Sequence, residues 1–154
     1  MRLASGIAPV RRMADAGMKV GLGVDGSASN ESGHMMNEAR QTMLLQRVEQ
    51  GGEAMTAREA LALATRGGAS VLGRDDIGML APGYAADIAA FDRRGIDFAG
   101  SDWDPLASLL FCGPVKANHT IINGRSVVED GQLMTMDMGR MLEQHRAMTH
   151  HLMQ

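Results

Sequence analysis

The spacing of apolar and polar positions changes along the chain, and these changes predict its elements. Residues 9–17 begin with Pro9 and end with Gly17, which is typical of the first turn and the end of a short helix. Residues 18–25 then alternate between bulky apolar side chains and positions that are mostly glycine. Because successive side chains of a strand point to opposite faces, this pattern predicts a strand with one apolar face and one nearly bare face ending in Asp25.

Two helices are expected after a short polar loop. Apolar side chains recur at helical spacing over residues 36–50, which predicts the first of them. Thr56 and Glu59 form the Thr-x-x-Glu pattern of a capping box, which predicts the start of the second. We expect this helix to end near residues 67–68 or to continue, with a break, to Leu72.

The rest of the chain predicts short strands, an irregular stretch and a final helix. The expected elements are strands at 77–80, 86–91, 115–122 and 125–128, an irregular stretch at 93–114, and a helix at 137–152. Asn123-Gly124 is a residue pair that hairpin turns prefer, and Asp130-Gly131 predicts a second turn. The order of elements predicts an α/β fold in three parts, at residues 1–73, 74–135 and 136–154.

Composition narrows the class of protein. A chain of 154 residues with 45% hydrophobic residues is long and apolar enough to form a globular core, in which its 14 methionines are expected to fill gaps. The net charge of −3 and the lack of a basic run argue against a nucleic-acid partner. A single cysteine, Cys112, excludes an internal disulfide, and no apolar run reaches the roughly 20 residues of a membrane span. We therefore expect a cytoplasmic protein.

Asp25 is the strongest candidate for chemistry. It follows directly on the predicted strand, and side chains at the carboxyl ends of strands form the active sites of α/β barrels. Aspartate in such a place also often caps the following turn. The residue pattern alone leaves both interpretations open.

The run from Gly21 to Asn30, Gly-Leu-Gly-Val-Asp-Gly-Ser-Ala-Ser-Asn, resembles the eighth-strand motif of the amidohydrolase superfamily. It is most similar to the branch that holds 8-oxoguanine deaminases, hydroxylated s-triazine hydrolases and guanine deaminases. Residues 2–9, 37–47 and 77–88 also resemble stretches of that family, so the resemblance covers nearly the whole chain. It implies the C-terminal portion of a TIM-type (β/α)8 barrel, with its last strand and following helices, then part of a small β-sandwich and a C-terminal helix.

The resemblance also implies a function and a site. The parent enzyme is expected to be a metal-dependent hydrolase of carbon–nitrogen bonds that deaminates a small heterocyclic substrate, a purine or triazine-type ring. Asp25 matches the position that binds a divalent metal, zinc or iron, and accepts a proton from the metal's water. Ser27, Asn30 and His34 are expected near the substrate, although Ser27 and Asn30 could instead satisfy backbone groups of the loop.

The sequence departs from the family in its histidines. The family binds metal through a His-x-His pair and a further histidine, and no His-x-His pair occurs among the five histidines of this chain. One carboxylate falls short of the roughly three protein ligands of a catalytic zinc site. We therefore expect a fragment that alone is inactive and binds no metal tightly.

Two alternatives to this fragment remain. One is a non-catalytic oligomerising module, because incomplete sheets leave edges and apolar faces that self-association would cover, and a homo-oligomer is expected for the same reason. The other, a nucleotide-phosphate binder, is disfavoured because Gly21-x-Gly23 lacks a third glycine at the required spacing.

Overall fold

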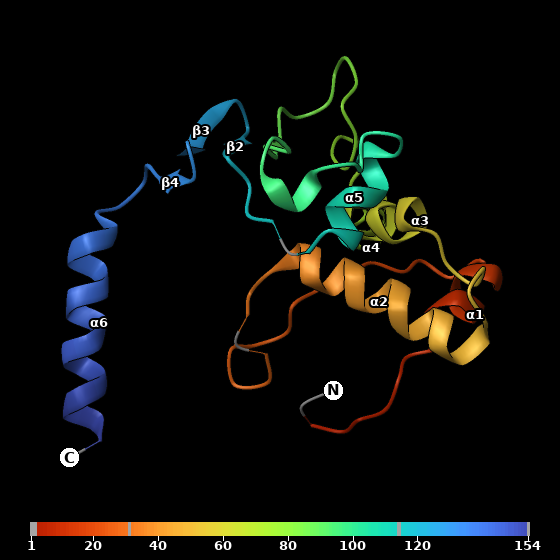
Figure 1. Ribbon diagram of the computed structural model, residues 1–154, viewed down its shortest axis with the longest axis horizontal. Coiled ribbons are helices and arrows are strands. Elements are labelled where there is room, and N and C mark those ends of the chain that lie inside the picture. The colour runs from red at the N-terminus through yellow and green to blue at the C-terminus, as the bar shows by residue number, and fades with distance from the viewer. Residues whose placement is uncertain (1–2, 31, 114, 154) are drawn as a thin grey trace. The chain divides into compact units, whose positions relative to one another are not determined.

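The computed structural model describes residues 3–30, 32–113 and 115–153. Arg2, at the start of one stretch on which the family resemblance rests, and Pro114, at the end of the expected irregular stretch, lie outside the described residues. The chain forms two compact units, one made of Met1–Tyr84 with Arg93–Val115 and the other of Ala85–Asp92 with Lys116–Gln154 (Figure 1).

The first unit is helical. Its elements are α1 (Val10–Asp15), α2 (Met35–Gln50), α3 (Ala57–Ala62), the π-helical turn η1 (Leu63–Gly67), α4 (Gly68–Leu72), the 3-10 turn η2 (Ile96–Phe98) and α5 (Pro105–Phe111). The helices predicted at 9–17 and 36–50 are confirmed as α1 and α2. The helix predicted after Thr56 continues to Leu72, and η1 is the break within it.

The core of the first unit lies around α2. Met43 of α2 and Leu110 of α5 are completely buried, and Met55 is nearly so. Ala39 and Ala60, also completely buried, allow α2 and α3 to approach each other closely. The prediction that methionine fills the core is confirmed at Met43 and Met55. It is wrong for exposed methionines such as Met18, Met134 and Met148.

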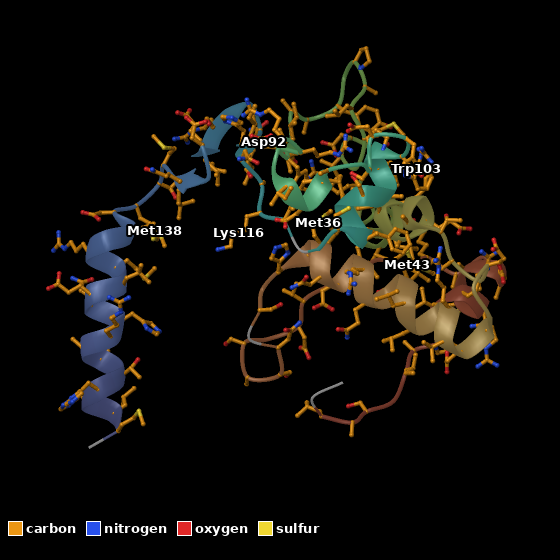
Figure 2. All side chains as sticks on the ribbon, viewed as in Figure 1. Met36, Met43, Asp92, Trp103, Lys116 and Met138 are labelled. Carbon is orange, nitrogen blue, oxygen red and sulfur yellow. The ribbon has the colours of Figure 1, made fainter. Side chains whose placement is uncertain are left out.

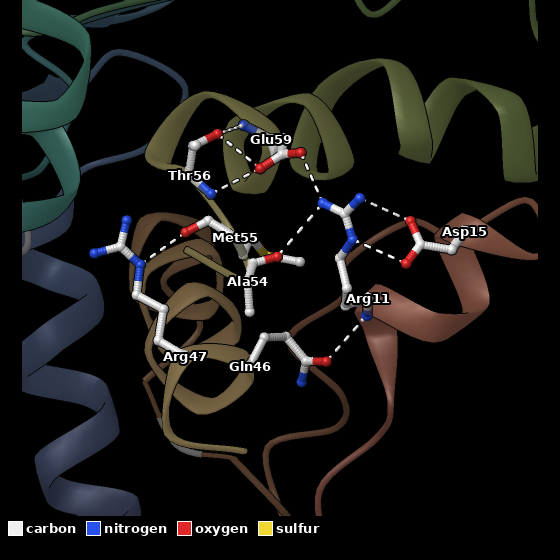
Figure 3. Close-up of polar contacts among 8 residues, drawn as sticks. All are labelled: Arg11, Asp15, Gln46, Arg47, Ala54, Met55, Thr56 and Glu59. Carbon is white, nitrogen blue, oxygen red and sulfur yellow. Dashed lines mark hydrogen bonds and ion pairs between the residues drawn. The ribbon is translucent and has the colours of Figure 1, made fainter. Parts of the chain in front are cut away.

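A polar network around Arg11 joins three helices of this unit (Figure 3). The guanidinium of Arg11, on α1, donates to Glu59 Oε1 at the start of α3 at 2.9 Å and to Asp15 Oδ2 at 3.1 Å. The backbone N–H of Arg11 donates to Oε1 of the buried Gln46, on α2, at 3.0 Å. The predicted capping box is confirmed as well, because Glu59 N donates to Thr56 Oγ1 while Glu59 Oε2 accepts from Thr56 N.

Three local predictions are wrong. Residues 18–25 carry no strand ladder, residues 77–79 form bends, and the stretch 93–114 contains η2 and α5. A strand requires a neighbouring strand for its backbone groups, and within the described part of the chain 18–25 has none; Met18 N donates to Met13 O, the end of the preceding helix. Gly78 has a φ of +89°, which interrupts an extended backbone.

Residues 20–21 lie directly against the junction of η1 and α4, in the second half of the helix that begins after Thr56. A Cβ on Gly67 would collide with the carbonyl oxygen of Val20, and a Cβ on Gly21 would stand 2.9 Å from Gly68 Cα. Gly21 belongs to the face that the alternation predicts to be nearly bare. In the structure the missing side chain at Gly21 allows close contact with a helix.

The second unit contains one open antiparallel sheet in the order β1 (Ile88–Ala90), β2 (His119–Ile122), β3 (Arg125–Glu129) and β4 (Gln132–Leu133). The strand predicted at 86–91 is confirmed in its centre, that at 115–122 in its second half, and that at 125–128 over its whole length. Both predicted turns are confirmed: Asn123 and Gly124 have φ values of 47° and 77°, and Asp130 and Gly131 have 48° and 76°. Positive φ at both central residues is the geometry of the type I′ hairpin turn.

The chain ends in α6 (Met138–Leu152), which matches the predicted final helix. Asp137 begins the helix by accepting a hydrogen bond from Arg140 N at 3.0 Å. No residue of α6 is buried, and its apolar side chains include Met148 and Leu152, which are 66% and 84% exposed (Figure 2). Among the described residues, no helix is long and apolar enough to cross a lipid bilayer.

Candidate active site

Asp25 occupies a tight turn at the end of the segment 18–25. Its backbone has a φ of 64°, a left-handed conformation that aspartate adopts more readily than most residues. Its carboxylate is exposed, and Oδ1 accepts a hydrogen bond from Gly26 N at 2.8 Å. The carbonyl oxygen of Gly26 then accepts from Ser29 N and Asn30 N, each at 2.9 Å. These bonds fix the backbone immediately after the carboxylate.

Asn30 joins this turn to α2. Its side-chain Nδ2 donates to Glu38 Oε1 at 2.6 Å, and its Oδ1 accepts from Ser32 N at 3.2 Å. Glu38 lies in the first turn of α2, where a negative charge interacts favourably with the helix dipole.

A polar hollow of about 620 Å³ lies between this loop and α2. This volume is within the range of small-molecule sites. Carboxylate, amide and guanidinium groups make up most of its polar lining, and two leucines contribute apolar side chains. The hollow is lined by Gly23, Val24, Asp25, Ser29, Asn30, Ser32, Asn37, Glu38, Arg40, Gln41, Leu44 and Leu45.

The structure brings together two of the four predicted site residues. Asp25 and Asn30 both line the hollow, whereas Ser27 and His34 are absent from its lining. Ser27 is exposed, and His34 precedes the first residue of α2 without a capping bond from its side chain. The substrate contacts of these residues remain predictions.

Sequence reasoning missed Glu38. The available signal was an acidic residue in the first turn of a predicted helix, directly after a loop rich in serine and asparagine. That signal predicts a helix start, and only the folded loop shows that the carboxylate binds Asn30.

The residues present do not form a metal centre. Within residues 3–30, 32–113 and 115–153, no group of three or more His, Cys, Asp or Glu side chains comes together in a way that could hold an ion. Asp25 offers one carboxylate, and a catalytic zinc site needs about three protein ligands with one position left for water.

A family model for the amidohydrolase family matches residues 1–127. The chain belongs to the amidohydrolase family. The resemblance found in the sequence is therefore confirmed.

Two of its curated relatives are deaminases. This amidohydrolase chain is 48% identical over 147 residues to an 8-oxoguanine deaminase of Pseudomonas aeruginosa, a match covering 96% of the chain and 32% of the relative. It is 42% identical over 139 residues to a 5-methylthioadenosine/S-adenosylhomocysteine deaminase of Pelotomaculum thermopropionicum, covering 89% and 32%. The chain thus spans about a third of the length of these relatives.

Solved structures of similar amidohydrolases contain zinc. A mutant atrazine chlorohydrolase from Arthrobacter aurescens TC1, complexed with zinc and atraton, is 37% identical with a TM-score of 0.83, over 92% of this chain and 32% of the other. An adenosine deaminase from Xanthomonas campestris with bound zinc is 29% identical with a TM-score of 0.87, over 94% and 34%. The fold of this chain is therefore that of about one third of these zinc-containing enzymes.

Proposed function

We propose that this chain is part of a metal-dependent hydrolase of carbon–nitrogen bonds that deaminates a purine or triazine-type ring, with 8-oxoguanine as the first substrate to test. The observation that carries the proposal is the 48% identity over 147 residues to an 8-oxoguanine deaminase. Residues 18–25 would form the last strand of a (β/α)8 barrel, paired with strands supplied by the rest of the whole protein. The sheet of the second unit would be part of a β-sandwich.

Asp25 is the residue that we propose this chain contributes to the chemistry. Among the residues that the structure describes, Asp25 and Glu38 are the carboxylates that line the hollow, and that of Glu38 is engaged by Asn30. Asp25 is exposed, and a backbone N–H orients its Oδ1. It is therefore the acidic group placed to face a ligand, and histidines from the rest of the enzyme would complete the metal site.

The polar contacts of the loop distinguish Asn30 from the other proposed substrate residues. Both ends of its side-chain amide are occupied, by Glu38 and by the backbone N–H of Ser32. This favours the alternative in which Asn30 holds the loop. Ser27 and His34 remain proposed substrate contacts on the evidence of the sequence alone, because neither lines the hollow.

A chimera tests the proposal. In it, the matching 147 residues of the Pseudomonas aeruginosa 8-oxoguanine deaminase are replaced by this chain, and ammonia release from 8-oxoguanine is measured. We expect the chimera to be active and its Asp25→Asn variant to lose on the order of 100-fold or more in kcat, because removing a group that moves the reacting proton typically costs 100- to 10,000-fold.

The matched control is Asp15→Asn, which removes an acidic group from the surface of α1 and leaves the hollow intact. It should keep the rate of the unmodified chimera. Full activity of the Asp25→Asn chimera would refute the role of Asp25. A folded, zinc-containing chimera that releases no ammonia from 8-oxoguanine or from related aminopurines and aminotriazines would refute the proposed reaction.

A further inference from the structure

The direction of the Asp25 carboxylate depends on the turn that follows it. Asp25 has a left-handed backbone, which a non-glycine residue keeps only when its surroundings hold it there. The surroundings here are three hydrogen bonds: Gly26 N to Asp25 Oδ1, and the N–H groups of Ser29 and Asn30 to the carbonyl oxygen of Gly26. All three lie in an exposed loop, where water competes for backbone groups.

Asn30 is the point at which this loop meets the helical core. It is the last residue of the turn that closes on Gly26, and its side chain is partly buried. Its amide donates to Glu38 Oε1 at 2.6 Å, a short bond of the charge-assisted kind, which is roughly twice as strong as a neutral one.

The turn of α2 that carries Glu38 is packed into the helical core. The next residue on α2, Ala39, is completely buried, and so is Met43 one turn later. Arg40 donates to the carbonyl oxygen of Leu110 at 2.9 Å, which fixes the same turn of α2 to α5. The Glu38 carboxylate is therefore a fixed point for the loop side of the hollow.

We propose that Glu38 is a positioning residue, which holds Asn30 and thereby the turn of residues 26–30 and the direction of the Asp25 carboxylate. This inference rests on the proposed function, since Glu38 acts on the reaction only through Asp25. Glu38 shares the hollow with Asp25, but its carboxylate is engaged by Asn30. Positioning of this kind matters because small misplacements of a reacting group reduce rates strongly.

The first test uses this chain and needs no activity. Hydrogen exchange of the Ser29 and Asn30 amides is compared in the unmodified chain, Glu38→Ala and Glu38→Gln. Glu38→Ala should speed their exchange on the order of tenfold, the effect of losing one charge-assisted hydrogen bond. Glu38→Gln, whose amide oxygen can still accept from Asn30, should stay near the unmodified chain. Glu49→Ala, in the exposed last turn of α2, is the matched control and should change nothing.

The second test places the same variants in the chimera. Glu38→Ala should lower kcat on the order of 10- to 100-fold with little change in KM, and Glu38→Gln should restore most of the rate. If Asp25→Asn abolishes activity while Glu38→Ala leaves kcat and the amide exchange unchanged, the positioning role is refuted and the proposed function stands. If Glu38→Gln is as damaged as Glu38→Ala, the contact with Asn30 is not what Glu38 supplies, and the inference also fails.

Discussion

At the scale of single residues, Glu59 shows how local hydrogen bonds change the pKa of a carboxyl group. Hydrogen bonds from the backbone N–H and the hydroxyl of Thr56, aided by the nearby Arg11 guanidinium, lower the pKa of Glu59 below its ordinary value of 4.5. These contacts favour the carboxylate over the acid, so they stabilise the folded chain when Glu59 is charged.

The lowered pKa of Glu59 predicts a pH dependence of stability. The contribution to stability is complete above the unfolded pKa, near 4.5, and is lost as pH falls through the lower folded pKa. Glu59→Gln should therefore destabilise the chain at pH 7 by up to about 1 kcal/mol, a small effect because the Arg11–Glu59 ion pair is partly exposed to solvent. In strong acid the variant and the unmodified chain should be equally stable. Chemical denaturation between pH 2 and 7 measures this. Glu53→Gln, at an exposed site in the preceding turn, is the control, and its stability should follow that of the unmodified chain at every pH. If Glu59→Gln lowered the stability by the same amount at all pH values, the lowered pKa of Glu59 would be contradicted.

At the same scale, the sequence predicted Asp25 through its family motif and missed Glu38. Asp25 belongs to a contiguous run that resembles a known strand end. Glu38 matters because of a bond to a residue eight positions away, across a loop whose shape follows from hydrogen bonds to Gly26. Such a contact depends on folded geometry and leaves no periodic pattern in the sequence.

At the scale of elements, the periodicity of apolar residues and the turn residues predicted the helices and turns that depend on local interactions. α2, α6 and both I′ turns are confirmed because helix faces and Asn-Gly or Asp-Gly pairs act over a few residues. α5 was missed although its signal was present: Asp104 accepts from Ala107 N at 2.9 Å, and Pro105 occupies the first turn. The sequence analysis placed Asp104-Pro105 in an irregular stretch, whereas the pair begins a helix.

The segment 18–25 failed as a strand for a different reason. Its alternation is the pattern of a strand, but the ladder requires neighbours, and the described part of the chain supplies none. The alternation of side chains predicts which residues of a segment share a face. It does not predict which strand will pair with that segment.

The close contact between this segment and η1–α4 gives a prediction for the element scale. Gly67 and Gly68 are adjacent and both helical, with φ values of −61° and −57°. A Cβ at Gly67 would collide with the Val20 carbonyl oxygen, whereas a Cβ at Gly68 meets nothing within 4 Å. Gly67→Ala should therefore destabilise the chain by about 1–3 kcal/mol, the usual effect of overpacking.

Gly68→Ala is the matched control for this prediction. It should be neutral or stabilise the chain by about 0.5–1 kcal/mol, because alanine favours a helix over glycine. Urea unfolding of the two variants decides the matter. Equal stabilities would show that residues 20–21 do not pack against this helix.

At the scale of the whole molecule, the chain spans about a third of the length of its deaminase relatives. In the part of the chain that the structure describes, the exposed carboxylate of Asp25 lines a hollow, and no group of three His, Cys, Asp or Glu side chains could hold an ion. The sequence predicts the C-terminal portion of such an enzyme, because it contains the motif that ends in Asp25 and no His-x-His pair. That the isolated chain binds no metal tightly stays a prediction. The identity of the ring substrate was beyond prediction, because a pocket of this kind is built by several strands from different parts of a protein.

The most direct test of this account is the zinc content of the purified isolated chain, measured beside that of the chimera after both are exposed to zinc and desalted. The account predicts about one tightly bound zinc ion per chimera and none retained by the isolated chain, since a catalytic site needs about three protein ligands. Stoichiometric zinc on the isolated chain, together with turnover of 8-oxoguanine, would contradict it.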